Sequence, residues 1–163
     1  ILGPGEIYTT GPVFAELGLT WPETVEMVEV TAFLAERLAA GAISFKPAEL
    51  GAYAFFDPDH TVRVPGRWEA PRHLLAAVSD TPPIELFWRK ERAAPCGASG
   101  GLPFTQPKLA GQLAQARLSE AAERGVTTLY TDDPQTLHHL RQAAAGSEIE
   151  VKGLFELLAA QLQ

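Results

Sequence analysis

The chain has 163 residues, a length typical of one domain, and its 46% hydrophobic and 20% charged residues match an ordinary globular protein rather than a disordered one. Thirteen basic residues against 20 acidic ones give a formal net charge of -7, which argues against nucleic acid or an anionic membrane as a partner. The sequence contains no run of 18 apolar residues, so we expect no membrane insertion.

A single cysteine, Cys96, limits the chemistry of the chain. It excludes an intrachain disulfide, and it excludes a four-thiolate zinc or iron–sulfur site built from this chain alone. A reducing cytoplasm is the simplest expectation for its location. Abundant proline, alanine and arginine, with one methionine and one cysteine, also fit a thermophilic source. The chain begins at Ile1 without a signal-peptide pattern, and we interpret it as a fragment, a processed chain or a numbering that starts inside a longer protein.

Glycine and proline divide the sequence into alternating strand-like and helix-like segments. Strands are predicted at 6–9, 28–30, 52–56, 84–88, 126–130 and 148–151. Helices are predicted at 12–17, 31–40, 71–78, 108–124, from 134 onward and at 153–162, with Thr31 and Asp133 as N-caps. This alternation predicts a doubly wound α/β domain with a mostly parallel sheet and helices on both faces.

An internal similarity suggests that the domain is built from two related halves. Residues 7–12 match residues 129–134, and residues 29–30 match residues 150–151, with offsets of 122 and 121 positions. We interpret residues 1–163 as a single domain, with 1–50 a truncated first half and 51–163 a complete second half.

Binding sites in such sheets form beyond the carboxyl ends of the strands, which here are residues 57–60, 95–97 and 131–134. Cys96 precedes a glycine-rich turn whose backbone N–H groups would lower the pKa of a thiol and cradle an anion. The alternative is a buried, inert thiol. The candidate cofactor-binding residues are Gly97, Ser99, Gly100 and Gly101, and Arg63, Arg67 and Arg72 lie near enough in sequence to attract an anion.

The loops together resemble a known family. The segments 56–60, 69–72, 95–101 and 133–136 are similar to the cysteine-rich CCG domain found in the B subunit of heterodisulfide reductase. The same domain occurs in iron–sulfur subunits of glycolate oxidase, of anaerobic glycerol-3-phosphate dehydrogenase and of lactate utilisation. The family spacing is preserved, because 35 residues separate Asp59 from Pro95 and 36 separate Cys96 from Asp133.

This chain departs from the family at the ligand positions. Of five positions that are cysteine in the family, only Cys96 remains, and Asp59, Pro95, Asp133 and Thr136 occupy the others. One thiolate cannot hold an iron–sulfur cluster on its own. The resemblance therefore implies the fold of a degenerate CCG domain without the metal chemistry of the family.

A mixed metal site is a further hypothesis. Asp59, Cys96 and Asp133, with His60, His138 and His139 nearby, offer carboxylate, thiolate and imidazole donors that suit zinc. Turn chemistry explains Asp59, and capping explains Asp133, without a metal. The adjacent His138 and His139 point about 100° apart on a helix, which makes a shared metal difficult.

The resemblance leads to two functional hypotheses. The first is an accessory, assembly or electron-transfer-complex subunit that associates with ferredoxin-like or flavin-containing oxidoreductase subunits. The second is a small-molecule or metal site in which Cys96 and His60 form a catalytic nucleophile–base pair beside Asp59. We favour the first, because no catalytic set is complete in the sequence.

Overall fold

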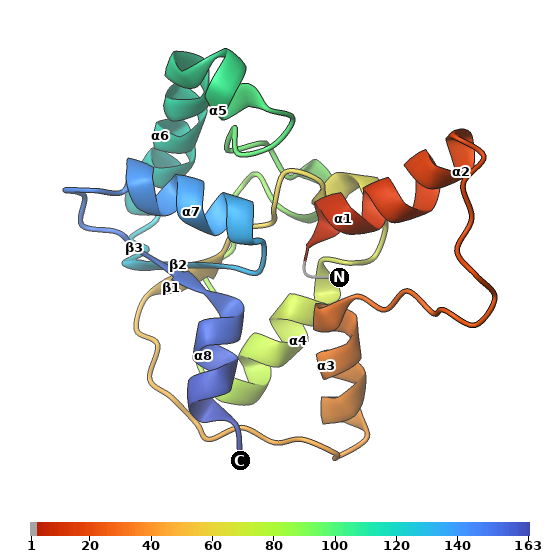
Figure 1. Cartoon of the computed structure of the whole chain (residues 1–163). Helices are drawn as coiled ribbons and strands as arrows, with labels where there is room; N and C mark the ends of the chain where they lie inside the picture. The colour runs from red at the N-terminus through yellow and green to blue at the C-terminus, as the bar shows by residue number, and fades with distance from the viewer. Residues whose placement is uncertain (1–2) are drawn as a thin grey trace.

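The computed structural model describes residues 3–163 (Figure 1). Its elements are α1 (Pro4–Tyr8), a π-helical turn (Thr9–Val13), α2 (Phe14–Glu16), α3 (Val30–Ala39), β1 (Tyr53–Phe55), α4 (Glu69–Val78), α5 (Leu102–Thr105), α6 (Pro107–Glu123), β2 (Thr128–Thr131), α7 (Pro134–Ala143), β3 (Glu150–Gly153) and α8 (Leu154–Gln161), with 3₁₀ turns at Thr61–Arg63 and Lys90–Arg92. Within these residues, no helix has the length and apolar character needed to span a membrane.

The three strands form one sheet in the order β1-β2-β3, and both of its strand pairs are parallel, which agrees with the mostly parallel sheet predicted from the sequence. Ala54 lies opposite Leu129, which lies opposite Val151 on the third strand. Because side chains alternate along a strand, Ala54 and Leu129 face one side of the sheet while Tyr53 and Tyr130 face the other. Both faces are therefore apolar and need covering.

Helices cover both faces of the sheet, which confirms the predicted α/β architecture (Figure 1). On one face, Ala114 and Leu118 of α6 and Leu140 of α7 pack with the Ala54 and Leu129 layer. On the other face, α4 and α8 pack against the two tyrosines. The buried residues that they contribute there are Leu74, Leu75, Val78, Leu154 and Leu158.

The predicted strand at 6–9 is wrong, because residues 4–8 form helix α1. Pro4 occupies the first helical turn, where its fixed φ favours a helix and its missing N–H costs nothing. The proposed counterpart of this segment, β2, is a strand. The structure thus does not confirm two related halves.

The predicted strand at 28–30 is also wrong, and so is Thr31 as an N-cap. Glu29 caps α3 instead, since its Oε2 accepts a hydrogen bond of 2.7 Å from the Ala32 N–H. Thr31 is fully buried, and its hydroxyl donates to Asp132.

The predicted strand at 84–88 forms no ladder. The Ile84 N–H does donate a hydrogen bond to the carbonyl of Tyr53 in β1, but the N–H groups of Phe87 and Trp88 bond elsewhere. The N–H groups of Phe87 and Trp88 both donate to Oε1 of Glu120, at 2.6 and 3.1 Å. A carboxylate from α6 thus replaces the strand partner that these amides would otherwise need.

A buried ion pair closes the carboxyl end of β1. Asp57 follows the strand with its side chain fully buried, and Arg72 of α4 donates to both of its carboxylate oxygens, at 3.0 and 2.9 Å. Arg72 also bonds Glu85. Burial would lower the pKa of Arg72, but the hydrogen bonds to Asp57 and Glu85 outweigh it and raise the pKa.

A second buried pair closes the carboxyl end of β2. Arg67 donates to Asp132 at 2.6 Å and to Glu29 at 3.0 Å, and Thr31 donates to the same Asp132 oxygen at 2.9 Å. Burial raises the pKa of Asp132, although these two donors favour its ionised form. The group joins the start of α3 to the end of β2.

The glycine-rich turn lies directly against α6. Gly97 has a φ of +88°, and a Cβ built there would lie 2.9 Å from both Cα and O of Ala110. Only glycine fits both this backbone conformation and this approach. Gly100 also has a positive φ, of +67°, but a Cβ there would meet open space.

We expect Arg72→Met to lower the free energy of unfolding by about 3–5 kcal/mol, because Asp57 would keep a buried charge without its main partner. Urea unfolding followed by circular dichroism measures the loss. The matched control is Lys152→Met, which removes an exposed pair with Glu150 and should cost at most about 1 kcal/mol. Equal losses in the two variants would contradict the role given to the buried pair.

We expect Gly97→Ala to destabilise the fold more than Gly100→Ala in the same unfolding measurement. Both substitutions place a side chain at positive φ, at a cost of roughly 1–3 kcal/mol, but only the first also collides with the Ala110 backbone. The difference between the variants isolates the close approach of the turn to α6. No difference would mean that α6 moves aside at little cost.

Candidate functional site

Asp59 organises the loop that carries the single cysteine. Its Oδ1 accepts a hydrogen bond of 2.8 Å from the Cys96 N–H. Its Oδ2 accepts from the Ser99 hydroxyl at 3.0 Å and, more weakly, from the Ser99 N–H at 3.4 Å. One carboxylate thus accepts hydrogen bonds from both Cys96 and Ser99 and fixes the conformation of the turn between them.

Cys96 is completely buried in the apolar layer between the sheet and α6. Burial raises the pKa of its thiol well above the ordinary value, and the nearby negative charge of Asp59 raises it further. Hydrogen bonds from the Ala98 backbone and the Thr136 side chain lower it by less. At neutral pH the group is a thiol, with little nucleophilic or metal-binding character.

Asp133 is the N-cap of α7, as the sequence predicted. Its Oδ2 accepts a hydrogen bond of 2.8 Å from the Thr136 N–H. The backbone of Gly3 approaches so closely that a Cβ there would overlap the other carboxylate oxygen. Asp133 is consequently buried and engaged by its own helix.

His60 lies on the outer side of the same loop, against α1. Its ring stacks on Tyr8, with 6.1 Å between the ring centroids, and the Arg63 guanidinium lies over the Tyr8 ring at 5.2 Å. The structure therefore uses His60 to hold α1. Its predicted role as a base for Cys96 stays a prediction without a contact that supports it.

The four predicted cofactor-binding residues divide into two pairs. Gly97 and Ser99 serve the turn itself, through the contacts with Ala110 and Asp59. Gly100 and Gly101 line an open cavity of about 520 Å³. Its other walls come from α5 and α7, and they include Phe104, Gln135, His138 and His139. His139 also hydrogen-bonds the Ala110 carbonyl at 3.2 Å.

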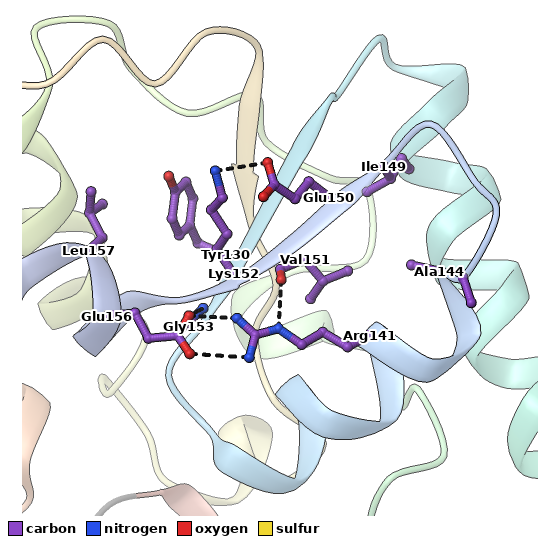
Figure 2. A pocket seen from close by; sticks show the side chains of 11 residues that line it. Tyr130, Arg141, Ala144, Ile149, Glu150, Val151, Lys152, Gly153, Glu156 and Leu157 are labelled. Carbon is purple, nitrogen blue, oxygen red and sulfur yellow. Dashed lines mark hydrogen bonds and ion pairs between the residues drawn. The ribbon is translucent and has the colours of Figure 1, made fainter.

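A cavity of about 540 Å³ lies beside the edge strand β3 (Figure 2). Its charged side chains neutralise one another: Arg141 forms a two-pronged pair with Glu156, and Lys152 pairs with Glu150. Arg141 also donates to the Val151 carbonyl at 2.9 Å. Hydrogen bonds from Arg141 and from the Gly153 backbone lower the pKa of Glu156. Charged side chains on an edge strand hinder its pairing with another chain. Because those that line this cavity are paired with one another, they do not offer a ligand an unpaired charge.

The structure brings two of the predicted metal ligands, Asp59 and Cys96, into contact. Asp59, Cys96 and Thr136 meet around the thiol, at three of the positions that the family resemblance assigns to cysteine. Among residues 3–163, however, no group of three or more His, Cys, Asp or Glu side chains is placed to hold a metal ion. The predicted ligand set of Asp59, Cys96 and Asp133 stays a prediction.

The sequence did not reveal the partners of two arginines. Arg67 and Arg72 were expected to attract an external anion, but they bind the protein's own Asp132 and Asp57. Each of these aspartates lies close to the point where a buried strand ends. An acidic residue at such a place is a signal for a buried cationic partner, although it does not say which one.

Comparisons with known proteins place the chain near iron–sulfur proteins, although no family model matches it. It is 27% identical over 164 residues to the D subunit of the dihydromethanophenazine:CoB–CoM heterodisulfide reductase of Methanosarcina barkeri, covering 96% of this chain and 40% of that subunit. It is 26% identical over 133 residues to a probable membrane-anchored ferredoxin of Chromohalobacter salexigens, covering 80% of this chain and 20% of that protein.

A third relative is an uncharacterized iron–sulfur protein of Methanocaldococcus jannaschii, 25% identical over 142 residues, which cover 82% of this chain and 27% of that protein. The chain thus spans at most about two fifths of the length of these relatives. The comparisons therefore support a relation of this chain to the D subunits of heterodisulfide reductases and to iron–sulfur proteins.

Proposed function

We propose that this chain is a degenerate CCG domain that has lost its cluster ligands and acts as an accessory or assembly part of an iron–sulfur oxidoreductase complex. One observation carries the proposal. At two positions where the family has cysteine, Asp59 and Asp133 use their side chains to bind the protein's own backbone. The contact of Asp59 fixes the loop that carries Cys96, and the contact of Asp133 fixes the start of α7. In the family, ligation of a cluster would connect these two segments.

The available donors do not fit an iron–sulfur cluster. Cluster iron is held by deprotonated cysteines, whereas this chain offers one buried thiol whose pKa is raised. Pro95 has no ligating side chain, and Thr136 offers a neutral hydroxyl in place of a thiolate. The proposal therefore gives the chain no redox step of its own.

The expected partners are oxidoreductase subunits that do carry cofactors. The relatives from Methanosarcina are named as subunits of a reductase, and another relative is named as a ferredoxin. We infer that the chain associates with ferredoxin-like or flavin-containing subunits in the cytoplasm. Its fold then serves as a scaffold, while the electrons pass through the partners.

The metal content of the protein tests the loss of the cluster. After purification without oxygen, we expect iron and sulfide far below one per chain and no visible absorption band. The physical reason is the missing thiolates. Stoichiometric iron with sulfide would contradict the proposal, and stoichiometric zinc would instead support the mixed site around Asp59, Cys96 and Asp133.

The accessory role is tested by isolating the tagged protein from its source. We expect a cofactor-bearing subunit to accompany it in a fixed ratio, both for the wild type and for Cys96→Ser. The substitution is nearly isosteric and leaves the surface unchanged, because Cys96 is buried. Loss of the partner or of the complex's activity in Cys96→Ser, with an unchanged melting temperature, would favour a reactive thiol instead.

We also expect the Cys96 thiol to be unreactive in the folded protein. Because it is buried and its pKa is raised, iodoacetamide at pH 8 should modify it at least about 100-fold more slowly than in urea-unfolded protein. Mass spectrometry of quenched samples gives both rates. Comparable rates would mean that the thiol is accessible and ionised, which contradicts its burial.

A further inference from the structure

The N-terminal arm, residues 9–28, exposes large apolar side chains along its length. It includes the π-helical turn, α2 and the coil that leads to α3, and it extends from the rest of the molecule (Figure 1). None of its residues is buried. Leu17 and Leu19 are 67% and 50% exposed. The further exposed apolar residues of the coil are Trp21, Val25, Met27 and Val28.

The arm is fixed at both of its ends. Before it, Tyr8 stacks on His60, and after it, Glu29 pairs with the buried Arg67. Between these points, the aromatic contacts join residues of the arm itself. Phe14 stacks on Trp21 with 5.6 Å between centroids, and the Trp21 indole N–H donates to the Thr10 carbonyl at 3.1 Å. The arm is thus held in place while its apolar side chains face outward.

Every charged side chain in the N-terminal part of the chain, residues 1–36, is negative. Residues 1–36 hold six of the 20 acidic residues and none of the 13 lysines and arginines. The remaining 127 residues hold 14 acidic and 13 basic residues, so they are almost neutral. Within the arm, Glu16, Glu23 and Glu26 are exposed among the apolar residues.

We propose that the arm is a docking element for another protein whose surface presents apolar side chains among lysines and arginines. Contiguous exposed apolar residues mark interaction sites, and the acidic residues select a partner of opposite charge. A second copy of this chain fits less well, since its arm would repel the first and the rest of its surface carries no excess of positive charge. This inference does not depend on the proposed function.

The test uses a defined basic, apolar probe. A fluorescein-labelled amphipathic helical peptide made of leucine and lysine is titrated with the protein, and fluorescence anisotropy gives the dissociation constant. We expect Leu17→Ser/Leu19→Ser/Trp21→Ser to weaken binding at least tenfold. Glu23→Lys/Glu26→Lys should also weaken it, and by more at low salt than at high salt because the charges are exposed.

The matched control is Phe104→Ser/Leu109→Ser, which removes two exposed apolar residues of α5 and α6, at 91% and 41% exposure. This variant should bind the peptide as the wild type does. The glutamate variant and the control should keep the wild-type melting temperature, since none of their side chains is buried. Trp21 holds the arm through Phe14 and Thr10, so Leu17→Ser/Leu19→Ser, which leaves both contacts in place, must also weaken binding.

Two results would overturn the proposal. One is a wild-type protein that does not bind the peptide, or that binds it no better than the leucine and tryptophan variant does. The other is a concentration-dependent dimer in sedimentation velocity that the same variant abolishes, because the occupant of the arm would then be a second copy of the chain.

Discussion

The buried pair between Arg67 and Asp132 is the constraint on which the arrangement of this molecule depends. Asp132 follows the central strand, so its carboxylate lies where three parallel strands end together. A buried carboxylate without a partner is strongly unfavourable, and Arg67 and Thr31 supply the hydrogen bonds that it needs. Thr31 belongs to α3, and Glu29 both caps that helix and bonds Arg67. The hydrogen bonds that stabilise the Asp132 carboxylate therefore also fix the position of α3.

The same principle explains how the polar groups at the carboxyl edge of the sheet are used. In open α/β sheets, ligands bind beyond these strand ends. Here Arg72 fills the end of β1 by pairing with Asp57, and Asp59 fills the next loop by bonding Cys96 and Ser99. These polar groups, which would otherwise face a ligand, are used by the protein itself. One open cavity is lined by the glycine-rich turn, α5 and α7, and the other mainly by α7, β3 and α8.

The sequence was most informative where local chemistry alone decides the structure. Asp133 before a proline predicted the start of α7, and the apolar run at 52–56 predicted β1, because capping and strand burial are properties of neighbouring residues. The partners of Arg67 and Arg72 were not predictable in this way, since Asp132 lies 65 residues from Arg67. The segment 84–88 has strand-like residues, yet Glu120, over 30 residues away, takes its amides. Such competition between distant groups leaves no local pattern.

Glu29 joins the exposed arm to the buried charges of the sheet. This residue directly follows the acidic arm and also pairs with the buried Arg67, which in turn pairs with Asp132 at the end of β2. These two ion pairs connect the end of the arm to the start of α3 and to the end of β2. Under the accessory role proposed for this chain, this attachment keeps the arm at a fixed place relative to the sheet. In the docking that we propose, the exposed residues of the arm select the partner surface, and the buried ion pairs fix where the arm joins the rest of the molecule.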